Sequence, residues 1–136
     1  MKLRDVMTPQ VATISSRQTI VTAAARMREL GIGSLVVLRD DDVEGIITTW
    51  DLTAGCLGAG HDPHECVVFT HMSTPVHTGD PDTDILEAAH SMAERHITRM
   101  PIVDGEKLVG IVSLSNMSQA MDRLTQDLLR GWTRPE

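Results

Sequence analysis

Gly45-Ile46-Ile47-Thr48-Thr49-Trp50-Asp51 is a stretch that the chain repeats 65 positions later, as Gly110-Ile111-Val112-Ser113-Leu114-Ser115-Asn116. Each copy has a glycine, two β-branched apolar residues, a hydroxyl residue and, three positions further on, an acid or its amide. Laying residue i over residue i + 65 without a gap gives eleven identities, from Met7/Met72 to Ile46/Ile111. We interpret this register as an internal duplication.

Both copies predict the same element order, β-α-β-β-α. Apolar residues recur at helical spacing from Ile20 to Leu30 and again from Ile85 to Met92. Gly31 is well placed to end the first helix, and Asp82 or Thr83 to begin the second. The remaining elements are extended segments at 10–14 and 76–78, apolar strand pairs at 35–38 with 43–47 and 100–103 with 108–112, and helices at 52–57 and 117–129.

The strand pairs are continuously apolar, which favours strands covered on both faces, and Asp104-Gly105 is a hairpin signal. A half of roughly 60 residues would be marginal alone. We therefore expect an α/β (α+β) fold in which two repeats pack about a pseudo-twofold axis. The predicted boundaries are 1–60 for the first repeat, 61–71 for the connector, 72–124 for the second repeat and 125–136 for a helix end and tail.

Composition and the absence of several sequence motifs argue against some classes of function. Twelve basic against nineteen acidic residues give a formal charge of −7, which disfavours nucleic acid and anionic membranes as partners. The chain has no long apolar stretch and no signal-peptide core, so we expect a cytoplasmic protein. A nucleophile elbow, a phosphate-binding loop and a dinucleotide fingerprint are all absent, so we expect no enzyme activity.

The hydroxyl and the acid or amide of each repeated stretch suit ligand binding. Asp51 could accept hydrogen bonds from a ribose diol, and Asn116 is its uncharged counterpart. Thr48 and Ser113 could donate to phosphate oxygens beside the N–H groups of a helix start. The same spacing is also that of a capping box, so these residues could simply complete a helix end.

These patterns resemble the cystathionine-β-synthase (CBS) domain family in its tandem form. The resemblance rests on Asp5-Val6-Met7-Thr8-Pro9, on the stretch from His96 to Val103 and on both repeated signatures, and it covers roughly residues 3 to 120. It implies a regulatory module with two clefts that bind AMP, ATP or S-adenosylmethionine, and no required cofactor. It also implies a homodimer acting on a regulated protein that the sequence does not identify.

The resemblance implies further cleft residues. Arg99 matches a basic position that contacts phosphate, with a solvated surface arginine as the alternative. Its counterpart in the first repeat is Ser34, so the two clefts are not expected to be equivalent. Positions near the base, ribose or adenine are Val11, Thr13, Ser34, Leu35, Val36, Val76, Thr78, Met100 and Pro101.

Two alternative functions remain open. Cys56, His61, His64, Cys66 and His71 lie within sixteen residues, and such soft ligands suit zinc. Their spacing is not that of a standard zinc finger, so we expect variation in an exposed loop and no metal, with a zinc-responsive or redox-responsive protein as the alternative. An apolar stripe from Met117 to Leu129 suggests a second alternative, a ligand-free dimeric scaffold.

Overall fold

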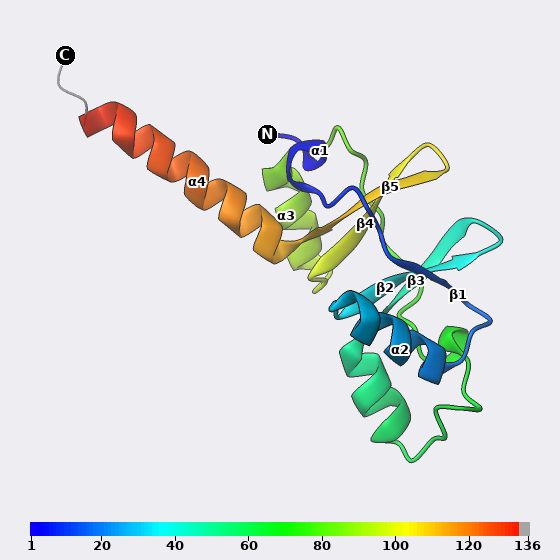
Figure 1. The fold of residues 1–136 in the computed structure, drawn as a ribbon. Coiled ribbons are helices and arrows are strands. Elements are labelled where there is room, and N and C mark those ends of the chain that lie inside the picture. Colours follow the sequence, from blue (N-terminus) through cyan, green and yellow to red (C-terminus); the bar gives the residue numbers. More distant parts are fainter. Residues whose placement is uncertain (134–136) are drawn as a thin grey trace. The chain divides into compact units, whose positions relative to one another are not determined.

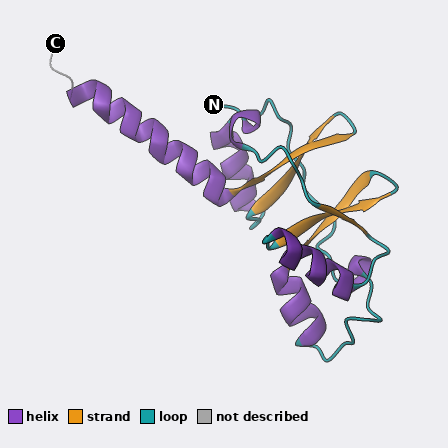
Figure 2. Cartoon of the chain, in the orientation of Figure 1, coloured by secondary structure: helices purple, strands orange, loops and turns teal. Residues whose placement is uncertain are grey.

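The computed structural model describes the backbone of residues 1–133 and the side chains of residues 1–131 (Figures 1 and 2). In chain order, the elements are α1 (Leu3–Val6), β1 (Thr13–Ser15), α2 (Ile20–Leu30), β2 (Ser34–Arg39), β3 (Asp42–Thr48), the π-helix η1 (Asp51–Leu57), the 3₁₀ turn η2 (Val68–Thr70), α3 (Ile85–Glu94), β4 (Arg99–Asp104), β5 (Lys107–Ser113) and α4 (Leu114–Thr133). None of the described helices is both long and apolar enough to cross a membrane.

The chain forms two compact units. The first-repeat unit runs from Val11 to His77. The second-repeat unit combines Met1–Gln10 with the chain from Thr78 onward. The N-terminal ten residues therefore pack with the second copy of the repeat, although they precede the first copy in sequence.

The first-repeat unit is a three-stranded sheet covered by α2. Strand β1 pairs in parallel with β2, and β2 pairs antiparallel with β3. Thr19 caps the start of α2 by accepting a hydrogen bond from the Thr22 N–H (3.2 Å), and Gly31 ends the helix in the left-handed conformation (φ 65°), as predicted. The core consists of Ile14, Ile20, Ala23, Met27, Leu35, Val37, Ile47, Leu52, Cys56 and Val68.

The second-repeat unit is a β4–β5 hairpin packed with α3, α4 and the N-terminal segment. Leu3 is fully buried and anchors that segment in the core. Its neighbours in the core are Ile85, Ala88, Met92, Met100, Ile102, Val112 and Met117. Leu3 is the buried residue of α1, and the partly buried Val6 and Met7 pack against the same core, so apolar contacts help to hold the N-terminal residues there.

Two local predictions about the second repeat were wrong. Asp84, rather than Asp82 or Thr83, caps α3, because its carboxylate accepts from the N–H groups of Leu86 (3.0 Å) and Glu87 (3.4 Å). Residues 76–78 form no strand, since the parallel bridge to β4 falls one residue later, at Gly79 opposite Ile102.

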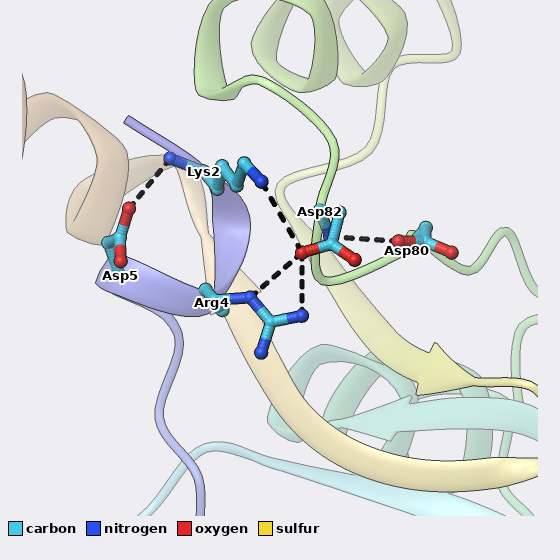
Figure 3. A network of polar contacts seen from close by, with 5 residues as sticks. All are labelled: Lys2, Arg4, Asp5, Asp80 and Asp82. Carbon is cyan, nitrogen blue, oxygen red and sulfur yellow. Dashed lines mark hydrogen bonds and ion pairs between the residues drawn. The ribbon is translucent and has the colours of Figure 1, made fainter.

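A network of exposed ion pairs fixes the N-terminal segment to the loop before α3 (Figure 3). Arg4 donates from Nε (2.9 Å) and Nη2 (2.6 Å) to Asp82 Oδ1, and Lys2 Nζ lies 3.7 Å from the same oxygen. The hydrogen bonds from Arg4 lower the pKa of the Asp82 carboxyl. Backbone bonds from Leu3 N–H to Thr83 and from Arg4 N–H to Pro81 (both 2.9 Å) complete the attachment.

The glycine of each repeated stretch lies under a crossing chain segment. Ser73 pairs with Ile46 in the first-repeat unit, and Thr8 pairs with Ile111 in the second-repeat unit. A Cβ at Gly45 would lie 2.7 Å from Met72 Sδ and 2.8 Å from the Ser73 carbonyl oxygen. A Cβ at Gly110 would likewise clash with the side chain of Met7. Each unit is therefore completed by a Met-Thr or Met-Ser segment from outside its own repeat in sequence.

Candidate functional site

Thr48 and Asp51 form a closed hydrogen-bonded pair where β3 passes into η1. Asp51 Oδ2 accepts from the Thr48 N–H (2.8 Å) and from the Thr48 hydroxyl (3.1 Å), while the Asp51 N–H points to Thr48 Oγ1 (3.4 Å). Both residues are half-buried. The capping arrangement that the spacing allowed is therefore present.

Ser113 and Asn116 repeat this arrangement where β5 passes into α4. Asn116 Oδ1 accepts from the Ser113 N–H (3.2 Å) and hydroxyl (2.9 Å), and the Asn116 N–H donates to Ser113 Oγ (3.1 Å). An amide thus makes the same cap as a carboxylate. In both copies one side-chain atom remains beyond the cap: Oδ1 of Asp51, a charged acceptor, and Nδ2 of Asn116, a neutral donor.

Strand register places a different side chain beside each hydroxyl. Ser34 is the partner of Thr48 across β2 and β3, and Arg99 is the partner of Ser113 across β4 and β5. Arg99 is exposed, whereas Ser34 is half-buried. One copy therefore combines a carboxylate with a serine, and the other combines an amide with a guanidinium group.

The remaining predicted cleft residues differ in how deeply they are buried. Leu35 and Met100 pack in the cores of their own units. Val36 and Pro101 are also buried, and because successive strand residues alternate in direction they lie on the opposite sheet face from Leu35 and Met100. Thr13 lies next to Val36 in the parallel β1–β2 pair. Val11 and Val76 are half-buried, and Thr78 is exposed.

The structure brings three of the five soft ligand residues together. The Sγ atoms of Cys56 and Cys66 and a ring nitrogen of His71 all lie within 4.8 Å of one another. The His61 ring lies against His71, with ring centroids 5.4 Å apart. His64 is not part of this group, because it is exposed and contacts Asp62 through Nδ1 (3.2 Å).

The two cysteines are free thiols, and Cys56 is fully buried. Burial, together with the neighbouring Cys66, raises the pKa of the Cys56 thiol. Cys56 lies on η1, Cys66 on the connector and His71 just after η2. Sequence spacing did not predict this grouping, since it depends on the connector folding back over the end of η1.

Comparison with known proteins identifies the family. The model of the CBS domain matches residues 3–57 and 67–123. The CBS domain-containing protein YhcV of Bacillus subtilis is 36% identical over 116 residues, which is 85% of this chain and 82% of YhcV.

Two solved structures show the same fold. Hypoxic response protein I, solved with two coordinated zinc ions, is 29% identical with a TM-score of 0.78, over 88% of this chain and 98% of that protein. The CBS domain pair of protein MJ0100, solved with 5′-methylthioadenosine and S-adenosyl-L-methionine, is 24% identical with a TM-score of 0.81, over 90% and 97%. The chain therefore belongs to the CBS domain family and is a tandem CBS pair.

Proposed function

We propose that this protein is a regulatory module that binds an adenosine-containing ligand, such as AMP, ATP or S-adenosylmethionine. The supporting observation is the Thr48–Asp51 pair. Its cap uses Asp51 Oδ2, so Oδ1 is left as a charged acceptor at the half-buried end of β3. A carboxylate oxygen in this position suits the vicinal diol of a ribose, since each hydroxyl can donate to it.

Neighbouring side chains support the rest of the ligand. Thr13 and Val36 are adjacent across β1 and β2 and could contact the base or sugar. The second-repeat unit carries a separate candidate site, because Arg99 stands beside Ser113 in the strand register and both can donate to a phosphate oxygen of a ligand bound there. The MJ0100 pair shares the fold at 24% identity, so the choice of an adenosyl ligand rests on the side chains of this chain.

The proposed role is regulatory rather than catalytic, because ligand binding would favour one arrangement of the protein over another. We also propose that it acts in the cytoplasm, as a homodimer, on a regulated protein of unknown identity. Self-association is supported by an apolar groove of about 470 Å³ between α2 and η1, lined in part by Ile32, Leu52 and Leu57. Ile32 and Leu57 are exposed there, and a second copy could cover them.

Titration calorimetry on full-length protein tests the ligand. The ligands to compare are AMP, ADP, ATP, 5′-methylthioadenosine and S-adenosylmethionine. Inorganic phosphate and adenine are the controls for the phosphate and base parts of a nucleotide. Saturable heat with at least one adenosyl ligand, and none with adenine alone, supports the proposal. No heat from any of them in folded, nucleotide-free protein would contradict it and favour a ligand-free scaffold.

Sedimentation analysis tests the dimer. Leu57→Glu places a charge in the α2–η1 groove and should shift the protein toward monomer. Leu86→Glu is the matched control, because Leu86 has a comparable exposure (60% against 58%), lies on α3 and is not among the residues that line this groove. Equal association of both variants would contradict an interface at the groove.

A further inference from the structure

We propose that Cys56, Cys66 and His71 form a zinc-binding site that ties the end of η1 to the connector. The proposal does not rest on the nucleotide proposal, because it uses residues other than Thr48 and Asp51 and different chemistry. All three belong to the first-repeat unit, so the site is complete within one compact unit.

The distances suit a tetrahedral metal. The three ligand atoms lie within 4.8 Å of one another. In a tetrahedral zinc site with Zn–S bonds of about 2.3 Å, neighbouring ligand atoms stand about 3.8 Å apart. Small side-chain rotations would therefore close the cluster around one ion, without any change in the backbone.

The donor set selects the metal. Two thiols and one imidazole are soft or borderline ligands that suit zinc and do not suit magnesium or calcium. Three protein ligands leave a fourth position. The exposed His61 ring contacts that of His71, with centroids 5.4 Å apart, and is one candidate for this position, with water as the alternative.

The local backbone is arranged to hold the three ligands. The Cys66 N–H donates to Asp62 O (3.0 Å) in the turn of the connector, and the His61 N–H donates to Cys56 O (3.0 Å) at the end of η1. His71 is fixed by its N–H bond to Val68 O (3.0 Å), and Val68 is buried in the core. Two of the three ligands are therefore attached to buried positions, which reduces the ordering entropy that binding would cost.

Metal binding would stiffen the segment that carries Asp51. η1 begins at Asp51 and contains Cys56, so a metal at Cys56 would fix the far end of the helix whose first residue is the candidate ribose acceptor. Zinc occupancy should therefore change the thermal stability of the first-repeat unit.

The test uses full-length protein purified without a polyhistidine tag and with a phosphine reductant. We expect about one equivalent of zinc per chain by elemental analysis after gel filtration. Removing the metal with a chelator should lower the melting temperature, and adding zinc should restore it. Cobalt(II) added to the apoprotein should give thiolate charge-transfer and tetrahedral d–d absorption bands, which report on ligand type without any activity assay.

Variants assign the ligands. Cys66→Ser and His71→Asn should each weaken zinc binding by more than the roughly 10–100-fold seen when an outer-shell partner is lost. These positions are preferable to Cys56, which is fully buried in the core, so that its replacement could unfold the protein. His64→Ala is the matched control, because it removes a histidine of the same connector that contacts Asp62 instead. It should bind zinc like the wild type.

Three outcomes would overturn the proposal. One is protein that holds no zinc and gives no thiolate–cobalt band. A second is zinc binding that His64→Ala reduces as much as His71→Asn does. The third is a Cys56–Cys66 disulfide, detected as missing free thiols in metal-free, unfolded protein that was isolated without the reductant.

Discussion

Asp51 Oδ2 accepts hydrogen bonds from both the N–H (2.8 Å) and the hydroxyl (3.1 Å) of Thr48, and Asn116 Oδ1 makes the same two contacts with Ser113. A capping role and a binding role are therefore separable in Asp51, because an amide can perform the first without the charge that the second needs. The chain itself provides the comparison, since its second copy carries that amide.

Asp51→Asn should keep the cap and weaken adenosyl-ligand binding. The substitution should lower the free energy of unfolding by about 1 kcal/mol or less, because Asn is a good capping residue and only the interaction of the charge with the helix start is lost. Hydrogen bonds to a charged group contribute about 1.5–3 kcal/mol, so affinity should fall roughly 10- to 150-fold. Calorimetry measures the affinity, and thermal melting measures the cap.

Thr48→Val is the complementary variant, because it removes the hydroxyl from the cap and should cost about 0.5–2 kcal/mol of stability. Trp50 lies between the two residues and is 75% exposed, so its fluorescence gives a second report on binding at this site. Wild-type affinity in Asp51→Asn would show that the carboxylate serves the cap alone.

Gly45→Ala should destabilise the protein more than Gly110→Ala. A Cβ at Gly45 would lie 2.8 Å from a backbone atom, the Ser73 carbonyl oxygen, whereas at Gly110 the corresponding Thr8 oxygen is 3.1 Å away. The closest neighbour of each glycine is a methionine side chain, Met72 or Met7, which can move, so the backbone oxygen accounts for the difference. Overpacking typically costs about 1–3 kcal/mol, and we expect the two variants toward opposite ends of that range. Urea denaturation gives the free energies of unfolding.

A double-mutant cycle separates the clash with the methionine side chain from the clash with the backbone carbonyl oxygen. Met7→Ala should relieve much of the cost of Gly110→Ala, giving a clear coupling energy. Met72→Ala should relieve less of the cost of Gly45→Ala, because the Ser73 carbonyl remains in place. Equal coupling energies in the two pairs would mean that the methionine side chains alone account for the need for glycine at these two positions.

Local patterns predicted most of the elements. The helical periodicity of 20–30, the end of that helix at Gly31 and the hairpin that leads into each repeated stretch are confirmed, because each depends on residues close in sequence. The start of α3 was missed, because Asp82, Thr83 and Asp84 are all capping residues and only the folded chain shows which one reaches the Leu86 N–H.

Long-range packing was not readable from the repeat. Its register pairs Met7 with Met72 and Gly45 with Gly110, yet in the fold Met7 crosses Gly110 and Met72 crosses Gly45. The burial of Leu3 contributes to the contact of Met7 with Gly110, and a single leucine in a four-residue helix gives no periodic signal. The sequence named Cys56, Cys66 and His71 among five candidate metal ligands, but it could not show that these three meet, since the return of the connector brings them together.

His96→Gly should stabilise the protein by about 0.5–1 kcal/mol. His96 follows α3 with φ 56°, and its counterpart Gly31 has φ 65° at the end of α2. The left-handed conformation costs a residue with a Cβ about 1–2 kcal/mol, and part of the gain is lost to the greater freedom of glycine in the unfolded chain. Gly31→Ala is the reciprocal control and should destabilise. A His96→Gly variant that melts below the wild type would show that the imidazole makes a stabilising contact.

Asp82→Asn should reduce stability at neutral pH and lose that effect in acid. Hydrogen bonds from Arg4 lower the pKa of Asp82 in the folded protein, so its contribution is fully present above the unfolded pKa of about 3.9. The contribution disappears as the pH falls through the lower folded pKa, where the wild-type carboxyl becomes protonated. The effect should be small, because both side chains are about half exposed and exposed ion pairs contribute little.

A cycle of Arg4→Ala, Asp82→Asn and the double variant, measured by urea denaturation at pH 7 and again at about pH 2.5, isolates the pair from the charges around it. Coupling should be favourable at pH 7 and near zero in acid, and high salt at pH 7 should also reduce it. Coupling that persists in acid would mean that the Arg4–Asp82 contact stabilises the N-terminal segment by packing and neutral hydrogen bonds. The attachment of Leu3 would then depend on its own burial and on the backbone bonds to Pro81 and Thr83, with no contribution from charge.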